Sequence, residues 1–173
     1  MSKRFLAIVD PWENSMPHDV EEFPYLESDT SIQCQLIYNQ LTRLRPLFDD
    51  IIVIDSGVTP NPLFAELHNI VSPIEGDLAY DGQTIEKNNY LSDKQDWDMW
   101  LCGFHYGRCI QGKITDIVTH YEWDYSRFHI IRNLSFQFPK DEKRRWSKWE
   151  QNINISENVK EYDWDYEERL TEL

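Results

Sequence analysis

The sequence contains little cysteine and no long hydrophobic run. Three cysteines among 173 residues are too few, and odd in number, for the disulfide framework of a small secreted protein. The apolar run 5–9 stops at Asp10, so it is shorter than the roughly 7–15 residues of a signal-peptide core. No apolar run reaches the roughly 20 residues that span a bilayer. We therefore expect a cytoplasmic protein that has no contact with a membrane.

Basic residues are also scarce. Lysine and arginine number 17 against 31 aspartates and glutamates, which gives a formal net charge of −14. Such a chain repels phosphates, so we expect that it does not bind nucleic acid. The acids gather in residues 10–30 and again after Ser156, whereas residues 140–148 form a basic island. Charge runs of this kind are either solvated faces or surfaces for a protein partner.

The remaining composition is that of a folded domain. Hydrophobic residues make up 40% of the chain and aromatic residues 14%, which argues against disorder. We expect residues 1–139 to form one α/β domain. Residues 140–173 are expected to form a charged, aromatic-rich C-terminal extension, packed on that domain or on a partner.

Short β-branched runs alternate with segments of helical periodicity. This alternation predicts a doubly wound, mainly parallel sheet with helices on both faces. The expected strands cover residues 5–9, 51–54, 99–103 and 128–138, and the expected helices cover 31–47 and 107–121. Shorter helices are expected around 63–68 and 141–151.

Reactive side chains follow the ends of the predicted strands. Asp10, Asp55 and the segment 102–109 fall at the carboxyl ends, where parallel sheets bind their ligands. A cysteine at the start of a helix meets backbone N–H groups that stabilise its thiolate, so we expect a lowered pKa for Cys109. Those N–H groups could also hold an oxyanion. The alternative is that Cys109 is a small buried hydrophobic residue.

Three motifs carry a resemblance to a known family. Cys102-Gly103, followed after five residues by Cys109-Ile110, resembles the nucleophile turn of the isochorismatase-like cysteine hydrolases. The run 5–10 resembles the first strand of that family, which ends in aspartate, and residues 84–91 resemble its lysine strand around Lys87. The resemblance covers roughly residues 5–138.

The resemblance implies a triad that hydrolyses a small amide or a related substrate. Asp10 would take the proton of the Cys109 thiol, Lys87 would pair with the carboxylate, and Cys109 would attack a carbonyl. The resemblance also implies a cis peptide bond between Phe104 and His105 that feeds the oxyanion hole. Phe104, His105 and Tyr106 would then contact the substrate. Family members commonly oligomerise, so a homo-oligomer is expected.

The chain departs from the family pattern in two places. Few residues separate Lys87 from the cysteine-bearing strand, so Lys94 is an alternative for the lysine of the site. Some family members bind a metal through an acid and histidines after the second strand. Asp55 matches the acid, but Ser56 and Gly57 supply no histidine, so we expect no metal and no other cofactor.

Two further interpretations stay open at the level of sequence. The chain could be a catalytically degenerate family member whose pocket is filled by Phe104 and Tyr106. It could instead be an acidic protein-binding or inhibitor protein without enzymatic activity, which binds its partner through the charged face.

Overall fold

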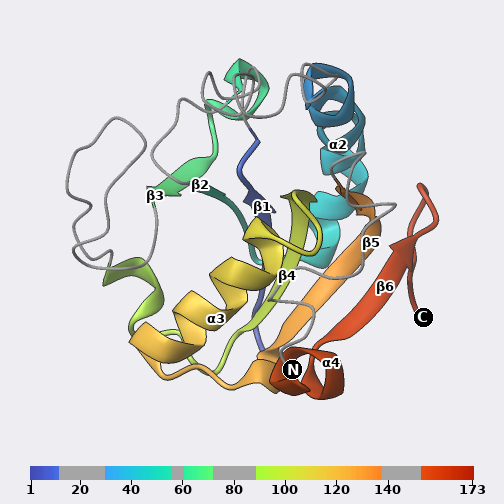
Figure 1. Ribbon diagram of the computed structural model, residues 1–173. Helices are drawn as coiled ribbons and strands as arrows, with labels where there is room; N and C mark the ends of the chain where they lie inside the picture. Colours follow the sequence, from blue (N-terminus) through green and yellow to red (C-terminus); the bar gives the residue numbers. More distant parts are fainter. Residues whose placement is uncertain (12–29, 56–60, 72–88, 138–152) are drawn as a thin grey trace, which may run out of the picture.

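A computed structural model describes residues 1–11, 30–55, 61–71, 89–137 and 153–173. These residues build one seven-stranded sheet in the order β3-β2-β1-β4-β5-β6-β7 (Figure 1). Every neighbouring pair is parallel except β6 with β7. The strands are β1 Arg4–Val9, β2 Asp50–Asp55, β3 His68–Val71, β4 Asp98–Phe104, β5 Phe128–Phe136, β6 Lys160–Trp164 and β7 Leu170–Glu172.

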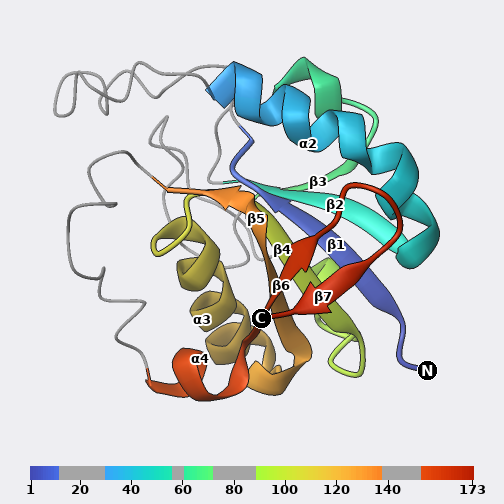
Figure 2. The same ribbon diagram turned by 90° about the vertical axis from the view of Figure 1, so that its right-hand side faces the viewer.

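Helices cover both faces of this sheet, as Figure 2 shows. α2 (Thr30–Leu44) lies on one face, here called the α2 face, and α3 (Cys109–Tyr121) lies on the other, the α3 face. The short helix α4 (Ile153–Asn158) precedes β6. The central strands are almost continuously buried because both of their faces are covered. The structure thus confirms the predicted α/β class and the mainly parallel sheet.

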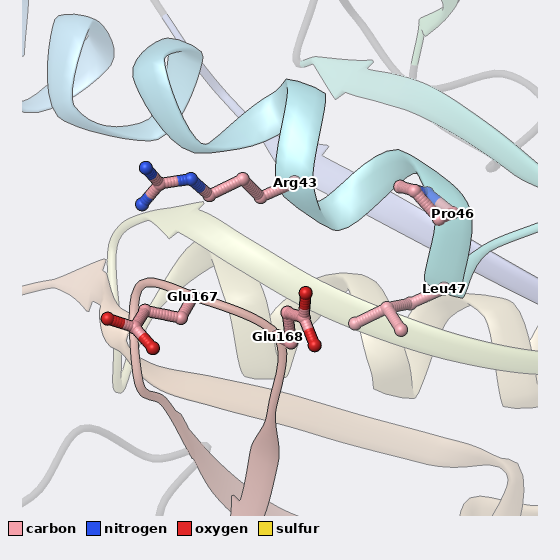
Figure 3. A pocket seen from close by; sticks show the side chains of 5 residues that line it. All are labelled: Arg43, Pro46, Leu47, Glu167 and Glu168. Atoms are coloured by element: carbon pink, nitrogen blue, oxygen red, sulfur yellow. The ribbon is translucent and has the colours of Figure 1, made fainter.

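The α2 face holds a hydrophobic cluster that includes Cys34, Cys102 and Trp164. Trp164 Nε1 donates a hydrogen bond of 3.1 Å to Gln40 Oε1, which joins β6 to α2 inside the cluster. A groove of about 580 Å³ lies on the surface nearby, between the end of α2 and the turn that joins β6 to β7 (Figure 3). Its lining residues are Arg43, Pro46, Leu47, Glu167 and Glu168.

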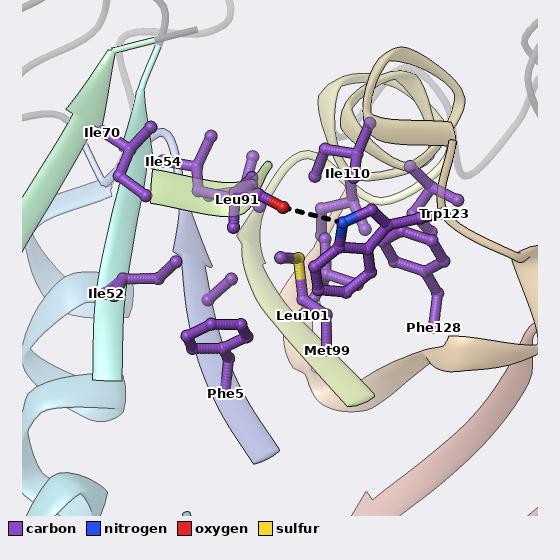
Figure 4. Close-up of a cluster of buried hydrophobic side chains, with 14 of the residues drawn as sticks. Phe5, Ile52, Ile54, Ile70, Leu91, Met99, Leu101, Ile110, Trp123 and Phe128 are labelled. Atoms are coloured by element: carbon purple, nitrogen blue, oxygen red, sulfur yellow. Dashed lines mark hydrogen bonds between the residues drawn. The ribbon is translucent and has the colours of Figure 1, made fainter. Parts of the chain in front are cut away.

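The second hydrophobic cluster fills the α3 face (Figure 4). The rings of Phe5 and Trp97 stack there with their centroids 4.3 Å apart. Trp123 Nε1 donates a hydrogen bond of 3.1 Å to the Leu91 carbonyl oxygen. This bond gives the buried indole N–H a partner, and leaving that N–H without one would destabilise the fold. In this cluster, side chains of α3 pack against side chains of β1, β4 and β5.

Several boundaries differ from those expected. The helix expected over 31–47 ends at Leu44, and a 3₁₀ turn, η2 (Arg45–Leu47), follows because Pro46 cannot continue an α-helix. The helix expected around 63–68 is the 3₁₀ turn η3 (Pro62–Phe64), and after a short turn over 65–67 β3 begins at His68. Two further 3₁₀ turns are η4 (Asn89–Leu91) and η5 (Tyr125–Arg127).

The C-terminal segment belongs to the sheet. β6 pairs in parallel with β5, and β7 returns antiparallel to β6. β6 and β7 therefore extend the sheet of the domain, with Trp164 buried in it, whereas the sequence predicted residues 140–173 to be an extension packed on the domain or on a partner. The acidic stretch 12–29 and the helix expected over 141–151 lie outside the described residues. Within the described ranges, no helix combines the length and the apolar composition that crossing a membrane requires.

Candidate active site

The strand order reverses between β1 and β4. Chain connections run from β1 outward to β2 and β3 on one side, and from β4 outward to β5 and β6 on the other. In open parallel sheets, ligands bind in the crevice that this reversal leaves at the carboxyl ends of the strands. Val9 is paired with Gly103 at that edge, so Asp10 and the turn after Phe104 lie where such a ligand would be expected.

Asp10 is held at the edge by the backbone. Its side chain is fully buried, and its N–H donates a hydrogen bond of 2.9 Å to the Ile54 carbonyl oxygen. Its φ angle is 46°, in the left-handed region that few residues other than glycine adopt. Asp55, the last residue of β2, is also fully buried. Two carboxyl groups thus follow neighbouring strands at the same edge.

The turn between β4 and α3 has a specific backbone shape. The peptide bond between Phe104 and His105 is cis, as the resemblance implied. The N–H of Tyr106 donates to the Phe136 carbonyl at 2.9 Å. The N–H of Gly107 donates to Gln111 Oε1 at 2.6 Å. These bonds fix the turn between β5 and the first turn of α3, so that α3 begins at Cys109.

The Cys109 thiol interacts with Asp10, with the backbone of His105 and with Lys113. The thiol donates a hydrogen bond to the Asp10 carboxylate and accepts one from the backbone N–H of His105. The positive charge of Lys113, one helical turn further along α3, also acts on the thiol. Cys109 is partly exposed, whereas Cys34 and Cys102 are fully buried. The thiol at the start of α3 is thus hydrogen-bonded to a buried carboxylate and lies in the field of a lysine cation.

The predicted lowering of the Cys109 pKa is wrong. Burial is the largest effect, and together with the negative charge of Asp10 it raises the pKa of the thiol well above its usual range. Lys113 and the His105 N–H act in the opposite direction but are outweighed. The sulfur is therefore held as a thiol beside a carboxylate, rather than as a thiolate stabilised by the helix.

The three predicted substrate contacts have different surroundings. Phe104 is fully buried on the α2 face and stacks on Phe136, with ring centroids 5.4 Å apart. Its side chain therefore faces the core, which corrects the prediction that it contacts substrate. His105 is 5% exposed, and burial, followed by the charge of Arg108, lowers its pKa to about 3. Its imidazole is thus neutral at physiological pH.

Tyr106 is the member of this group that reaches the surface. It is partly buried on the α3 face, and its hydroxyl donates to the Glu161 carboxylate on β6. The guanidinium of Arg132 lies over its ring, 3.9 Å from the centroid.

The structure changes the assignment of the lysine. Lys87 lies outside the described residues. Lys94 donates to the Tyr90 carbonyl at 2.7 Å, and Tyr90 in turn donates to Asp50 at the amino end of β2. Lys94 is therefore at the opposite edge of the sheet, and it is not the alternative that the sequence suggested. Lys113 was missed, although its spacing of four residues from Cys109 places the two on one helix face.

Among the residues that the structure describes, no three His, Cys, Asp or Glu side chains converge in a way that could hold a metal ion. Comparisons of the chain with protein-family models, with curated proteins and with solved structures found no match.

Proposed function

We propose that this chain is an isochorismatase-like hydrolase that cleaves a small amide or related substrate through a cysteine nucleophile. The observation that carries the proposal is the hydrogen bond from the Cys109 thiol to the buried Asp10 carboxylate, at the edge where the strand order reverses. A nucleophile within hydrogen-bond reach of its base is the arrangement that covalent hydrolysis requires.

In the proposed reaction, Asp10 is the general base. It takes the proton of the Cys109 thiol as the sulfur attacks the substrate carbonyl carbon. The Asp10 carboxylic acid then returns this proton to the leaving amine, and a thioester remains on Cys109. Water, deprotonated by Asp10, cleaves the thioester to a carboxylic acid and the free thiol. His105 is not the base, because a pKa of about 3 leaves its ring a poor proton acceptor at neutral pH.

Backbone donors support the negative charge that develops on the carbonyl oxygen. The N–H of His105 already points at the sulfur, so it is close to any carbonyl that the sulfur attacks. Among the first N–H groups of α3, that of Ile110 is already bound to the His105 carbonyl oxygen at 3.3 Å. The donor next to the sulfur is therefore the N–H of Cys109 itself, the first residue of that helix. These donors together favour the oxyanion over the neutral carbonyl.

Lys113 supplies positive charge behind the pair. It is 7% exposed and acts on the sulfur from within α3. A neighbouring cation favours both the Asp10 carboxylate and the transient thiolate. In the proposal it shares this role with Lys87, the lysine that the family resemblance implies.

The packing of Phe104 supports an active site over a degenerate one. The degenerate interpretation requires Phe104 and Tyr106 to fill the pocket, yet Phe104 lies in the core of the α2 face. The ring of Tyr106 is sandwiched between Arg132 and the α3 cluster, and its hydroxyl is bound to Glu161. Both rings are thus used in packing against other parts of the protein.

The test has two parts. Ammonia release would be measured on a panel of small primary amides with the wild-type protein and with Cys109→Ala, Asp10→Asn and, as a matched control, Cys102→Ala. We expect Cys109→Ala and Asp10→Asn to lower kcat/KM at least 10³-fold, while Cys102→Ala retains activity. In parallel, mass spectrometry would follow alkylation of Cys109 by iodoacetamide. A Cys109 that reacts no faster than the buried Cys34 and Cys102, at a rate that Asp10→Asn does not alter, would overturn the proposal.

A further inference from the structure

The helix that carries the nucleophile is capped from within. Among the described residues, the side chain of Arg108, which precedes α3, makes no capping hydrogen bond. The first N–H groups of a helix need partners outside its regular ladder. In a capping box, a glutamine or glutamate at the third helical position reaches back and accepts such an N–H. Because Cys109 is the first residue of α3, Gln111 occupies this third position.

Gln111 reaches back to Gly107. Its Oε1 accepts the Gly107 N–H at 2.6 Å in a buried hydrogen bond. The Gln111 side chain is itself buried, with 2% of the residue exposed, so water does not compete for this N–H. Gly107 has a φ angle of 79°, which glycine adopts without strain and can also leave without strain. A contact from outside the turn is therefore needed to select this conformation, and Gln111 provides it.

The bond from Gln111 is made at the middle of the nucleophile turn. The two sides of the turn are joined by the His105 carbonyl oxygen, which accepts the N–H groups of Arg108 at 3.1 Å and of Ile110 at 3.3 Å. The N–H of His105 is directed at the Cys109 sulfur. Gly107 lies midway in the chain between His105 and Cys109, so a rotation of its backbone would move the sulfur relative to its partners.

We propose that Gln111 is a positioning residue of the hydrolase, which holds the Gly107 N–H and thereby keeps the Cys109 thiol against the Asp10 carboxylate. The inference rests on the proposed function and adds the residue that sets the geometry of its nucleophile. Gln111 acts through the backbone of the turn, without a contact to the substrate. A displacement of about 1 Å at a reacting group can lower a rate about 10²-fold.

A glutamine that only stabilised the helix would have a different signature. Its substitution would lower the free energy of unfolding but leave the contact between Asp10 and Cys109 intact in the folded molecules. Two charged groups act on the thiol, the Asp10 carboxylate from the end of β1 and the Lys113 ammonium from α3. The distinguishing quantity is the effect of the first: how far Asp10→Asn shifts the pH profile of Cys109 alkylation. Lys113 is the same in every variant.

The test measures this shift by mass spectrometry with iodoacetamide, in the wild type and in three variants at α3. Gln111→Met keeps the length of the side chain and removes the acceptor, whereas Gln111→Glu keeps an acceptor oxygen. Thr115→Val is the matched control, because Thr115 lies one turn further along α3 and its hydroxyl has no hydrogen-bond partner within the described residues. Each protein would be compared with its own Asp10→Asn version.

In the wild type and in Thr115→Val, Asp10→Asn is expected to shift the profile to lower pH by the same amount. In Gln111→Met the shift should fall to about half or less, because the thiol no longer faces the carboxylate. Gln111→Glu should retain the shift, because its carboxylate accepts the Gly107 N–H. An undiminished shift in Gln111→Met, or its loss in Gln111→Glu, would overturn the positioning role. A wild-type profile that Asp10→Asn does not move would instead overturn the hydrolase, so the two failures are distinguishable.

A second measurement needs no substitution at Gln111. Amide hydrogen exchange of Gly107 in the wild type is expected to be at least about tenfold slower than in an open peptide, because its N–H is bonded and buried. Exchange at the rate of an open peptide would show that the bond is not maintained in solution, and the positioning role would be overturned even if Gln111→Met did not fold.

Discussion

A Cβ atom on Gly103 would lie 2.5 Å from the carbonyl oxygen of Val9 and 2.9 Å from its nitrogen. Gly103 also has a φ angle of 108°, which side chains rarely tolerate. The central pair of strands, β1 and β4, therefore approaches closely only because this residue is glycine. The same close approach brings Asp10 to the start of α3.

We expect Gly103→Ala to lower the free energy of unfolding by about 2–5 kcal/mol, the sum of backbone strain and overlap with a rigid backbone. Urea unfolding would measure the change. Cys102→Ala, in the preceding position of the same buried strand, is the matched control, and its expected cost is only about 1 kcal/mol. Equal costs for the two variants would show that the close approach to Val9 is relaxed in solution.

The Asp10 charge raises the pKa of the Cys109 thiol, so its removal should have opposite effects on two measurements. Asp10→Asn should shift the pH profile of Cys109 alkylation to lower pH, because the thiolate no longer faces a carboxylate. If the proposed function holds, the same variant should lose amide hydrolysis, because the proposed general base is gone. An alkylation profile that moved to higher pH would contradict this arrangement.

Lys113 acts on the same thiol with the opposite sign. Lys113→Met removes the positive charge and keeps much of the apolar stem, so the alkylation profile of Cys109 should move to higher pH. Lys94→Met, at the other edge of the sheet, is the matched control and should leave the profile in place. Coincident profiles for wild type and Lys113→Met would remove Lys113 from the site.

His105 should make the fold sensitive to mild acid. Burial lowers its pKa from 6.5 to about 3, so between these values the unfolded chain binds a proton that the folded chain does not. Stability is then fully present above pH 6.5 and declines as the pH falls toward 3, by up to about 1.4 kcal/mol per pH unit. His105→Gln should flatten this decline between pH 7 and 5, measured by urea unfolding. The exposed His120 provides the control, since His120→Gln should leave the slope unchanged.

The hydrogen bond between Trp164 and Gln40 should contribute measurably to stability. Trp164 is 1% exposed, and Trp164→Phe would leave the buried Gln40 oxygen without its donor, at a cost of about 1–3 kcal/mol plus the lost packing. In Trp164→Phe/Gln40→Leu both polar partners are gone, so part of that loss should be recovered. Strictly additive changes in the double-mutant cycle would show that the bond contributes nothing.

Local patterns in the sequence were sufficient for the central strands and for α3. Continuous apolar runs that end in acids predict buried parallel strands, and β1, β2 and β4 follow within a residue or so. β3 could not be predicted, because His68–Val71 contains two polar residues and only four positions. β6 was not predicted because three of its five residues, Lys160, Glu161 and Asp163, are charged. The strand is held by the buried Trp164 and by Asn133, whose side-chain amide hydrogen-bonds both the N–H and the carbonyl of Trp164.

For the site, the sequence placed Asp10 at a strand end and Cys109 at the start of a helix, as the structure has them, but it gave the wrong direction for the shift of the thiol pKa. The helix N-terminus favours a thiolate, yet burial and the facing carboxylate outweigh it. Burial of this kind depends on tertiary packing, which local sequence does not encode.

The pairing of β1 with β4 also bears on the order of folding. Arg4 is aligned with Asp98, so this contact closes a long stretch of chain, whereas α3 and its first turn are local. Contacts between distant residues form late because closing the intervening chain costs entropy. Cys109 would thus meet Asp10 only after the centre of the sheet has assembled. Until then its thiol has the reactivity of a free cysteine, and a brief alkylation pulse during refolding can time the moment at which the site is completed.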